Sequence, residues 1–320
     1  MRIHVRAAIL FLCFFPQLFL LAGEVVSPKS ISEMKLVPGE YDAVMNGIRI
    51  HYTIRGSGPA LMAHSGGPGI DARGWDDFAG IDEFATVIVI HPRGSGLSAP
   101  APDDAYSLSD YALDLEALRL HLGLEKPIML GWSHGGIVAQ QFASTYPDSL
   151  SKLILVSTSA YFGEFLGNIE TAVRVFEDRP WYRASLAALK QEWAGEYETD
   201  EDMTRLWAHE MKFYFKDFNE RAMSYHERTR DLPFRAAPLK VFNAGEAATL
   251  DLRPRLKDIS VPTLVIVGRH DFITNVAMAQ EMVERIPDAR LAVFEGSGHF
   301  AWVEEPERFH RVIERFILAE

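Results

Sequence analysis

Short runs of apolar residues recur along most of the chain, and stretches with helical spacing separate several of them. Continuous Val, Ile and Leu runs are typical of strands that a parallel sheet buries on both faces. The first half of the chain contains four such runs, at residues 60–64, 86–91, 127–131 and 153–157. Helical spacing covers residues 108–122 and 135–146 between them. This alternation predicts a parallel α/β sheet with right-handed crossover connections.

The strand pattern begins and ends with further elements. Asn46-Gly47, a dipeptide that favours tight hairpin turns, separates segments at 42–45 and 48–54 and predicts a β-hairpin. Towards the C-terminus the predicted elements are strands at 262–268 and 291–294 and helices at 276–286 and 306–318. The last of these helices is amphipathic, which is typical of a helix that packs one face on a core.

The region between these two parts has a different pattern. Residues 161–241 contain no good strand candidate and are rich in Trp, Tyr, Phe, Glu and Arg at helical spacing. We interpret this region as a helical insertion that forms a cap. The predicted organisation is a signal peptide at 1–23, a core in two parts at 24–158 and 256–320, and the helical cap at 159–255.

Composition narrows the class of protein. The chain has 320 residues, 48% of them hydrophobic and 24% charged, which suits one large α/β domain with an insertion or two domains. Its net charge of −12 argues against nucleic acid as a partner, because the phosphates would be repelled. The sequence has no glycine-rich dinucleotide fingerprint, P-loop or His-Glu-x-x-His motif, so we predict no cofactor and no metal.

The first residues have the features of an export signal. Arg2 and Arg6 precede an apolar stretch at 7–22, which is short for a membrane span. Cleavage near residues 22–23 predicts a periplasmic or secreted protein with no stable membrane span, and an uncleaved N-terminal anchor is the alternative. The one cysteine, Cys13, lies in this segment, so the mature protein would contain no disulfide, Cys-ligated metal or Cys nucleophile.

The junction Gly131-Trp132-Ser133-His134-Gly135 carries the most specific chemistry in the chain. Gly-x-Ser-x-Gly between a strand and a helix is the nucleophile elbow of serine hydrolases. The turn is so tight that the residues two before and two after the serine must be small, and it projects the hydroxyl from the top of the sheet. We therefore predict that Ser133 is a nucleophile.

A serine hydroxyl needs a general base and an acid that orients the base. Asp271 follows the predicted strand at 262–268, and His299 follows the last predicted strand. This order, with serine first, acid second and histidine last, is that of α/β-hydrolases. His299 would take the proton of Ser133 and return it to the leaving group, while Asp271 would hold the imidazole tautomer.

An acyl-transfer site also needs N–H donors for the developing oxyanion. One donor is expected to be the backbone N–H of His134, directly after the nucleophile. The other is expected from the loop His64-Ser65-Gly66-Gly67-Pro68-Gly69, in which consecutive glycines let the backbone approach a substrate closely. Gly66 and Gly67 are both candidates.

Together these motifs resemble the α/β-hydrolase superfamily, and most closely its prolyl aminopeptidase (proline iminopeptidase) branch. The likeness rests on Gly66-Gly67-Pro68-Gly69, His91-Pro92-Arg93-Gly94-Ser95-Gly96-Leu97-Ser98, the Ser133 elbow, Gly268-Arg269-His270-Asp271 and Gly298-His299. It spans roughly residues 40–158 and 255–320. The resemblance implies an α/β-hydrolase fold, with a mostly parallel eight-stranded sheet, helices on both faces and a helical cap insertion.

The sequence departs from that branch in two loops and at the elbow. Ser65 replaces the family histidine when the glycines are aligned, whereas aligning His64 makes the loop resemble that of carbon–carbon bond hydrolases. His91 stands where these peptidases have aspartate. The elbow, Gly-Trp-Ser-His-Gly-Gly, is closer to that of general esterases.

The predicted cap is expected to determine the substrate. The resemblance implies that cap carboxylates bind a free substrate amine, because a desolvated ammonium needs opposite charge nearby. Glu192 and Glu210 lie among aromatic residues and are the candidates, and Trp132 beside the nucleophile is a further candidate contact. A solvated surface position is the alternative for either glutamate. The expected partner is a small molecule or a short peptide.

Four functions are open at this point. The first is an aminopeptidase that cleaves an N-terminal residue, proline above all, from short peptides or amides through an acyl-enzyme. The second is a carboxylesterase or lactonase that uses the same triad on small apolar esters. The third is hydrolysis of a carbon–carbon bond. The fourth is a non-catalytic binding protein related to these enzymes, and the presence of all three triad candidates argues against it.

Overall fold

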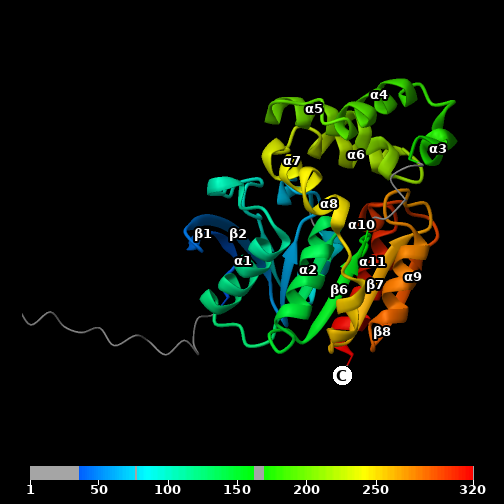
Figure 1. The fold of residues 1–320 in the computed structure, drawn as a ribbon. Coiled ribbons are helices and arrows are strands. Elements are labelled where there is room, and N and C mark those ends of the chain that lie inside the picture. Colours follow the sequence, from blue (N-terminus) through cyan, green and yellow to red (C-terminus); the bar gives the residue numbers. More distant parts are fainter. Residues whose placement is uncertain (1–35, 76–77, 162–168, 320) are drawn as a thin grey trace, which may run out of the picture. The chain divides into compact units, whose positions relative to one another are not determined.

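The computed structural model describes residues 36–75, 78–161 and 169–319 (Figure 1). The predicted signal peptide at 1–23, with Cys13, lies outside the described residues, and the predicted export stays a prediction. Within the described residues, no helix is at once long enough and apolar enough to cross a membrane.

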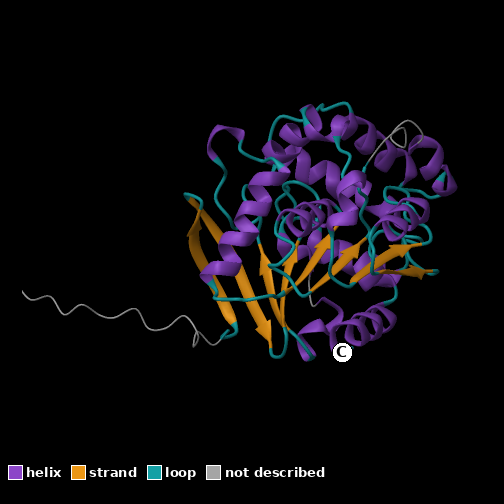
Figure 2. Ribbon diagram, turned by 60° about the horizontal axis from the view of Figure 1, so that its bottom comes forward, coloured by secondary structure: helices purple, strands orange, loops and turns teal. Residues whose placement is uncertain are grey.

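A mixed sheet of eight strands runs through the described structure (Figure 2). In chain order the strands are β1 (Gly39–Met45), β2 (Ile48–Gly56), β3 (Ala60–His64), β4 (Thr86–Ile90), β5 (Ile128–Trp132), β6 (Lys152–Val156), β7 (Thr263–Gly268) and β8 (Ala289–Phe294). Their order in the sheet is β1-β2-β4-β3-β5-β6-β7-β8. The pairs β1–β2 and β2–β4 are antiparallel and the other pairs are parallel. This confirms the predicted eight-stranded, mostly parallel α/β sheet.

The first hairpin follows the sequence pattern, whereas the last strand differs from it at one end. Asn46 and Gly47 both have positive φ angles, 49° and 81°, as the tight turn between β1 and β2 requires. β8 begins at Ala289, two residues before the predicted strand. This end of the edge strand is partly exposed and includes the exposed Arg290, so its residues do not form an apolar run.

Helices cover both faces of the sheet (Figure 2). Outside the segment between β6 and β7 they are α1 (Leu108–His121), α2 (His134–Thr145), α9 (Val276–Arg285), α10 (Ala301–Glu304) and α11 (Pro306–Leu318). α1, α2 and α9 pack on the face that carries Met129, and α10 and α11 pack on the face that carries Leu130. Successive strand residues therefore enter two separate cores, which is why these strands are continuous apolar runs.

The segment between β6 and β7 is helical. Its helices are α3 (Ile169–Val173), α4 (Tyr182–Trp193), α5 (Asp200–Glu210), α6 (Glu220–Thr229), α7 (Ala236–Ala244) and α8 (Glu246–Thr249). We call residues 169–249 the helical insertion, which lies above the sheet in Figure 1. Among the described residues of the whole segment, the only β pairing is an isolated bridge between Tyr161 and Asp251. The bounds of a separate cap domain, 159–255, stay a prediction.

The helical insertion packs on loops that leave the carboxyl ends of the strands. The N–H of Arg235 donates to the carbonyl of Gly69, in the loop after β3, at 3.0 Å. The N–H of His299, in the loop after β8, donates to the carbonyl of Tyr214 at 2.7 Å. Ligands of open α/β sheets bind at this edge. The helical insertion therefore borders the region in which a site is expected.

Candidate active site

Ser133 occupies a strained turn between β5 and α2. Its φ and ψ angles are 54° and −123°, a combination that residues other than glycine rarely adopt. A side chain at Gly131 would overlap the carbonyl of Gly135, and one at Gly135 would overlap the carbonyl of His64. Only glycine fits at either position, as a nucleophile elbow requires. The Ser133 side chain itself is partly exposed.

Asp271 and His299 form a buried pair. Asp271 Oδ2 lies 2.7 Å from His299 Nδ1, and both residues are almost completely buried. The Asp271 carboxylate also accepts the N–H groups of Ile273 and Thr274, each at 3.0 Å, and the Thr274 hydroxyl at 2.8 Å. These donors fix the carboxylate, which favours the His299 tautomer with its proton on Nδ1. Nε2 is then the basic nitrogen.

Trp132, which precedes Ser133 in the elbow, packs against His299. The rings of Trp132 and His299 have centroids 5.5 Å apart. In the described part of the chain, Ser133 makes no side-chain hydrogen bond to His299. Such bonds often tighten only when a substrate binds. The structure thus brings Asp271 and His299 into direct contact, and places Ser133 next to a residue whose ring contacts His299.

The predicted oxyanion donors lie at the elbow. His134 is the first residue of α2, and Gly66 packs so closely on Trp132 that a Cβ atom there would lie 2.7 Å from the indole ring. Gly67 follows, and its carbonyl accepts the N–H of Ile70 at 3.1 Å. Among the described residues, the N–H groups of His134, Gly66 and Gly67 donate to no protein acceptor. No protein acceptor therefore competes for these three N–H groups among the described residues, as the predicted role of oxyanion donor requires.

Trp132, a predicted substrate contact, is only 2% exposed. Its ring packs against Trp75, Phe300 and Trp302 as well as against His299. A cavity of about 20 Å³ lies beside it, between residues of the core and of the helical insertion. A space of this size holds about one water molecule. Trp132 is therefore a buried wall of the site.

Glu192 and Glu210, the predicted amine ligands, come close enough to affect each other's charge. They lie near the C-terminal ends of α4 and α5. Burial raises the pKa of Glu192 to about 7, and burial followed by the charge of Glu192 raises the pKa of Glu210 well above its usual range. Glu210 is 1% exposed, and its Oε2 atom has no hydrogen-bond partner among the described residues. Glu210 is buried and Glu192 is partly exposed, and together they form an acidic pair that favours a bound proton or a nearby cation.

Tyr214 lies near both this acidic pair and the Asp271–His299 pair. Its ring packs edge-on against His299, with centroids 5.4 Å apart. Burial, followed by the charges of Glu210, Glu192 and Asp271, raises the pKa of Tyr214 well above its usual range. A hydroxyl that all three carboxylates affect lies near all of them. Nothing in the sequence singles out Tyr214, because it is one aromatic residue in an aromatic-rich segment.

Glu304 connects the His299 loop to the helical insertion. One carboxylate oxygen accepts the N–H of Gly298 at 2.7 Å, and the other accepts the N–H of Lys216 at 2.8 Å. Burial raises the pKa of Glu304 to about 7 despite these donors. Sequence reasoning missed this residue, since its one signal is a position shortly after His299.

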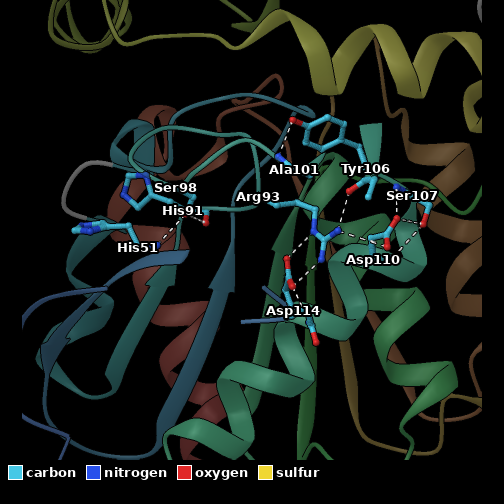
Figure 3. A network of polar contacts seen from close by, with 11 residues as sticks. His51, His91, Arg93, Ser98, Ala101, Tyr106, Ser107, Asp110 and Asp114 are labelled. Carbon is cyan, nitrogen blue, oxygen red and sulfur yellow. Dashed lines mark hydrogen bonds and ion pairs between the residues drawn. The ribbon is translucent and has the colours of Figure 1, made fainter. Parts of the chain in front are cut away.

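A polar network holds the loop after β4 (Figure 3). The Ser98 hydroxyl accepts the N–H of His51 at 2.9 Å and donates to the carbonyl of His91 at 2.6 Å. Arg93 makes a bidentate pair with Asp114 of α1, at 2.7 and 2.8 Å, and both residues are buried. These bonds satisfy the buried side chains of Arg93 and Ser98, which indicates a structural role for them, whereas the buried hydroxyl of Ser95 has no partner among the described residues.

His91, which stands where the peptidases have aspartate, meets an aspartate from another loop. Its Nδ1 atom lies 3.7 Å from Asp71 Oδ1 and accepts the N–H of Leu97 at 3.1 Å. Burial lowers the pKa of His91 to about 4, so the ring is neutral at neutral pH. Asp71 follows the glycine loop that ends at Gly69. The contact between His91 and Asp71 therefore links the loop after β3 to the loop after β4. These are the two loops whose motifs resemble the prolyl aminopeptidases most specifically.

Comparison with known proteins agrees with this geometry. The profile of the alpha/beta hydrolase fold family matches residues 59–306. A proline iminopeptidase from Saccharolobus solfataricus is 28% identical over 85% of this chain and 89% of its own length. The 3-oxoadipate enol-lactonase 2 of Acinetobacter baylyi is 29% identical over 71% of this chain and 77% of its own length. A solved thermophilic esterase from Thermogutta terrifontis, with malate bound, has a TM-score of 0.67 at 26% identity and covers 87% of this chain and 98% of its own.

These similarities confirm the resemblance that the motifs indicate. The matched residues include the glycine loop, the elbow and the segments that carry Asp271 and His299. The relatives are a peptidase, a lactonase and an esterase by name. Since one fold carries all three activities, the substrate has to be argued from the site.

Proposed function

Because this chain belongs to the alpha/beta hydrolase fold family and is a hydrolase, we propose that Ser133, His299 and Asp271 are its catalytic triad. In this mechanism Ser133 attacks the substrate carbonyl while His299 Nε2 takes the hydroxyl proton. Asp271 keeps the imidazole oriented and stabilises the imidazolium. His299 then gives the proton to the leaving group, and water hydrolyses the acyl-enzyme that remains.

The oxyanion formed by this attack would bind the N–H groups of His134 and Gly66. Gly67 is the alternative second donor, because its N–H also has no protein acceptor among the described residues. Removing one such donor typically costs about 3 kcal/mol of transition-state stabilisation.

The acidic pair of Glu192 and Glu210 carries the proposal for the substrate. Burial disfavours both carboxylates as anions. A substrate ammonium between them would offset their charge and lower both pKa values again. The charges of both glutamates affect Tyr214, whose ring contacts His299, so an amine held by the pair would belong to the residue whose carbonyl Ser133 attacks. The proposed enzyme is an aminopeptidase that removes an N-terminal residue from short peptides or amides.

Proline is the N-terminal residue that we favour. The similarity to a proline iminopeptidase supports this choice. The helical insertion would act as the cap that excludes longer chains.

Hydrolysis of small apolar esters or lactones is the second candidate function. One observation in its favour is the raised pKa of both glutamates, since a protonated pair presents no charge to an uncharged acyl group. The similarity to an enol-lactonase also supports it. This candidate uses the same triad but needs no substrate amine.

Hydrolysis of proline 4-nitroanilide, its N-acetyl derivative and 4-nitrophenyl butyrate separates the two candidates. We expect cleavage of the free-amine anilide and a loss of about 100-fold on acetylation, because two charge-assisted hydrogen bonds disappear. Ser133→Ala is the control and is expected to lose turnover of every substrate. Ester turnover without anilide cleavage would favour the second candidate, and full activity of Ser133→Ala would refute the triad.

A further inference from the structure

A groove in the helical insertion gathers basic side chains. It lies between α5, the 3-10 turn Met211–Tyr214, α6 and the segment 230–235, and its volume is about 540 Å³. Its lining includes six basic side chains: Arg205, His209, Lys212, His226, Arg230 and Arg235. The chain as a whole has a net charge of −12, whereas four Lys and Arg side chains face three carboxylates, Asp200, Glu201 and Asp231, in this lining.

Lys212 lies near Arg230, His209 and His226 of this set. It is partly buried, and no carboxylate of the described residues forms an ion pair with it. Burial, and next the charge of Arg230, lowers the pKa of Lys212. Burial also lowers the pKa of His209 and of His226, and the charge of Lys212 adds to both shifts. Lys212 therefore lies near one like charge, that of Arg230, and near two histidines whose lowered pKa values favour the neutral ring, and no carboxylate in the described ranges pairs with it.

The acidic residues that line the groove compensate only part of this charge, and none of them pairs with Lys212. Asp200 is engaged by Arg235, at 2.7 Å, and Glu201 is exposed. Asp231 has an 88% exposed side chain and lies 3.6 Å from Arg230. Surface pairs of this kind contribute little stability. A ligand in the groove would compete easily with Asp231 for Arg230.

We propose that this groove binds a phosphoryl group, as the free phosphate ion or on a small molecule, through Lys212, His209 and Arg230. These three side chains come from α5, the 3-10 turn and the segment after α6. A phosphoryl group presents oxygen atoms in several directions, which suits donors from separate segments. His226 is held at the groove by a 2.6 Å hydrogen bond from Nε2 to the carbonyl of Ala208. One side of the site is therefore preformed.

The groove is separate from the proposed catalytic residues. His209 and Lys212 line it, whereas Glu210 between them is buried beside Glu192 and Tyr214. Binding to the groove is therefore measurable without turnover. If the groove binds no phosphoryl group, the proposed hydrolase function is unaffected. If the proposed function is wrong, phosphate binding to the groove is unaffected.

Isothermal titration calorimetry of the full chain with inorganic phosphate, at ionic strength held constant with sodium chloride, tests the proposal. The wild-type protein is expected to bind one phosphate per chain with saturable heat. Lys212→Gln is expected to weaken binding about tenfold or more, the usual loss for one charge-assisted hydrogen bond. Lys190→Gln removes an exposed lysine of α4 outside the groove and is expected to bind phosphate like the wild type.

A second titration with glycerol 3-phosphate distinguishes the two sources of the phosphoryl group. Tighter binding than that of phosphate would indicate a small phosphomonoester as the ligand, and weaker binding would indicate the free ion. The proposal would be overturned by the absence of saturable heat with both compounds. Equal affinities of the wild type and Lys212→Gln would overturn it as well.

Discussion

The backbone carbonyl of Tyr214 accepts the N–H of His299 at 2.7 Å, and the Tyr214 ring packs against the His299 imidazole. The helical insertion thus contacts the proposed general base twice, once through its backbone and once through a side chain. The charges of Glu192 and Glu210 also affect Tyr214. Tyr214 is therefore close to both the proposed amine site and His299, the proposed general base.

Removing the Tyr214 ring is expected to impair catalysis. Tyr214→Ala takes away packing that orients His299, and loss of such an orienting contact typically costs 10- to 100-fold, so we expect kcat/KM to fall by about that factor. Tyr214→Phe keeps the ring and is expected to stay close to the wild type. Steady-state kinetics of both variants check this prediction. An alanine variant as active as the wild type would show that the ring does not orient His299.

The Asp271–His299 contact predicts a large effect of Asp271→Asn. An amide in place of the carboxylate favours the wrong imidazole tautomer, and kcat is expected to fall by about 10⁴-fold. Asp288→Asn changes an exposed aspartate near β8 and is the matched control, expected to be as active as the wild type. If Asp271→Asn kept most of its activity, a different acid would have to orient His299.

The raised pKa of Glu304 predicts a pH dependence of stability. This carboxyl has a pKa of 4.5 in the unfolded chain and of about 7 in the folded protein. Between these values the folded state binds more protons than the unfolded state, so the free energy of unfolding falls as pH rises. The wild type is therefore expected to lose more stability between pH 5 and pH 8 than Glu304→Gln, which does not ionise.

Urea denaturation at pH 5 and at pH 8 measures this difference. The groups that titrate elsewhere in the protein are shared by the wild type and the variant, so their contributions cancel. Glu307→Gln, at a position with a 70% exposed side chain, is the control and is expected to follow the wild type. Equal losses of stability in the wild type and Glu304→Gln would contradict the prediction.

The buried pair of Arg93 and Asp114 predicts a strong effect on stability. Asp114→Ala leaves the buried guanidinium without its bidentate partner, and a change of this kind destabilises proteins by about 3–5 kcal/mol. Urea denaturation at neutral pH checks the loss, with the fully exposed Asp148→Ala as the control. An Asp114→Ala variant as stable as Asp148→Ala would show that the pair contributes no stability.

The residues of the proposed triad were predictable because local rules determine their positions. Close backbone contacts at Gly131 and Gly135 exclude any side chain, so the elbow around Ser133 is visible in the sequence. Asp271 and His299 follow the ends of β7 and β8, and the carboxyl ends of parallel strands meet at one edge of a sheet.

The surroundings of the triad were less predictable, because packing between distant segments determines them. Glu192 and Glu210 were candidates from their aromatic neighbours, but no spacing indicates that α4 and α5 would bring them together. Trp132 was expected to contact a substrate, whereas rings from separate parts of the chain bury it. Glu304 connects two segments that are remote in sequence, which no local pattern reveals.

The proposed recognition of a substrate amine by Glu210 is tested most directly by one ratio of rates. This is the kcat/KM for proline 4-nitroanilide divided by that for 4-nitrophenyl butyrate, measured in the wild type, in Glu210→Gln and in Glu196→Gln. Glu196 is an exposed glutamate shortly after α4, and its variant is expected to keep the wild-type ratio. In Glu210→Gln we expect the ratio to fall about tenfold or more, because one charge-assisted contact to the ammonium is lost while the ester reaction keeps its triad. An unchanged ratio in Glu210→Gln would contradict the proposed amine site.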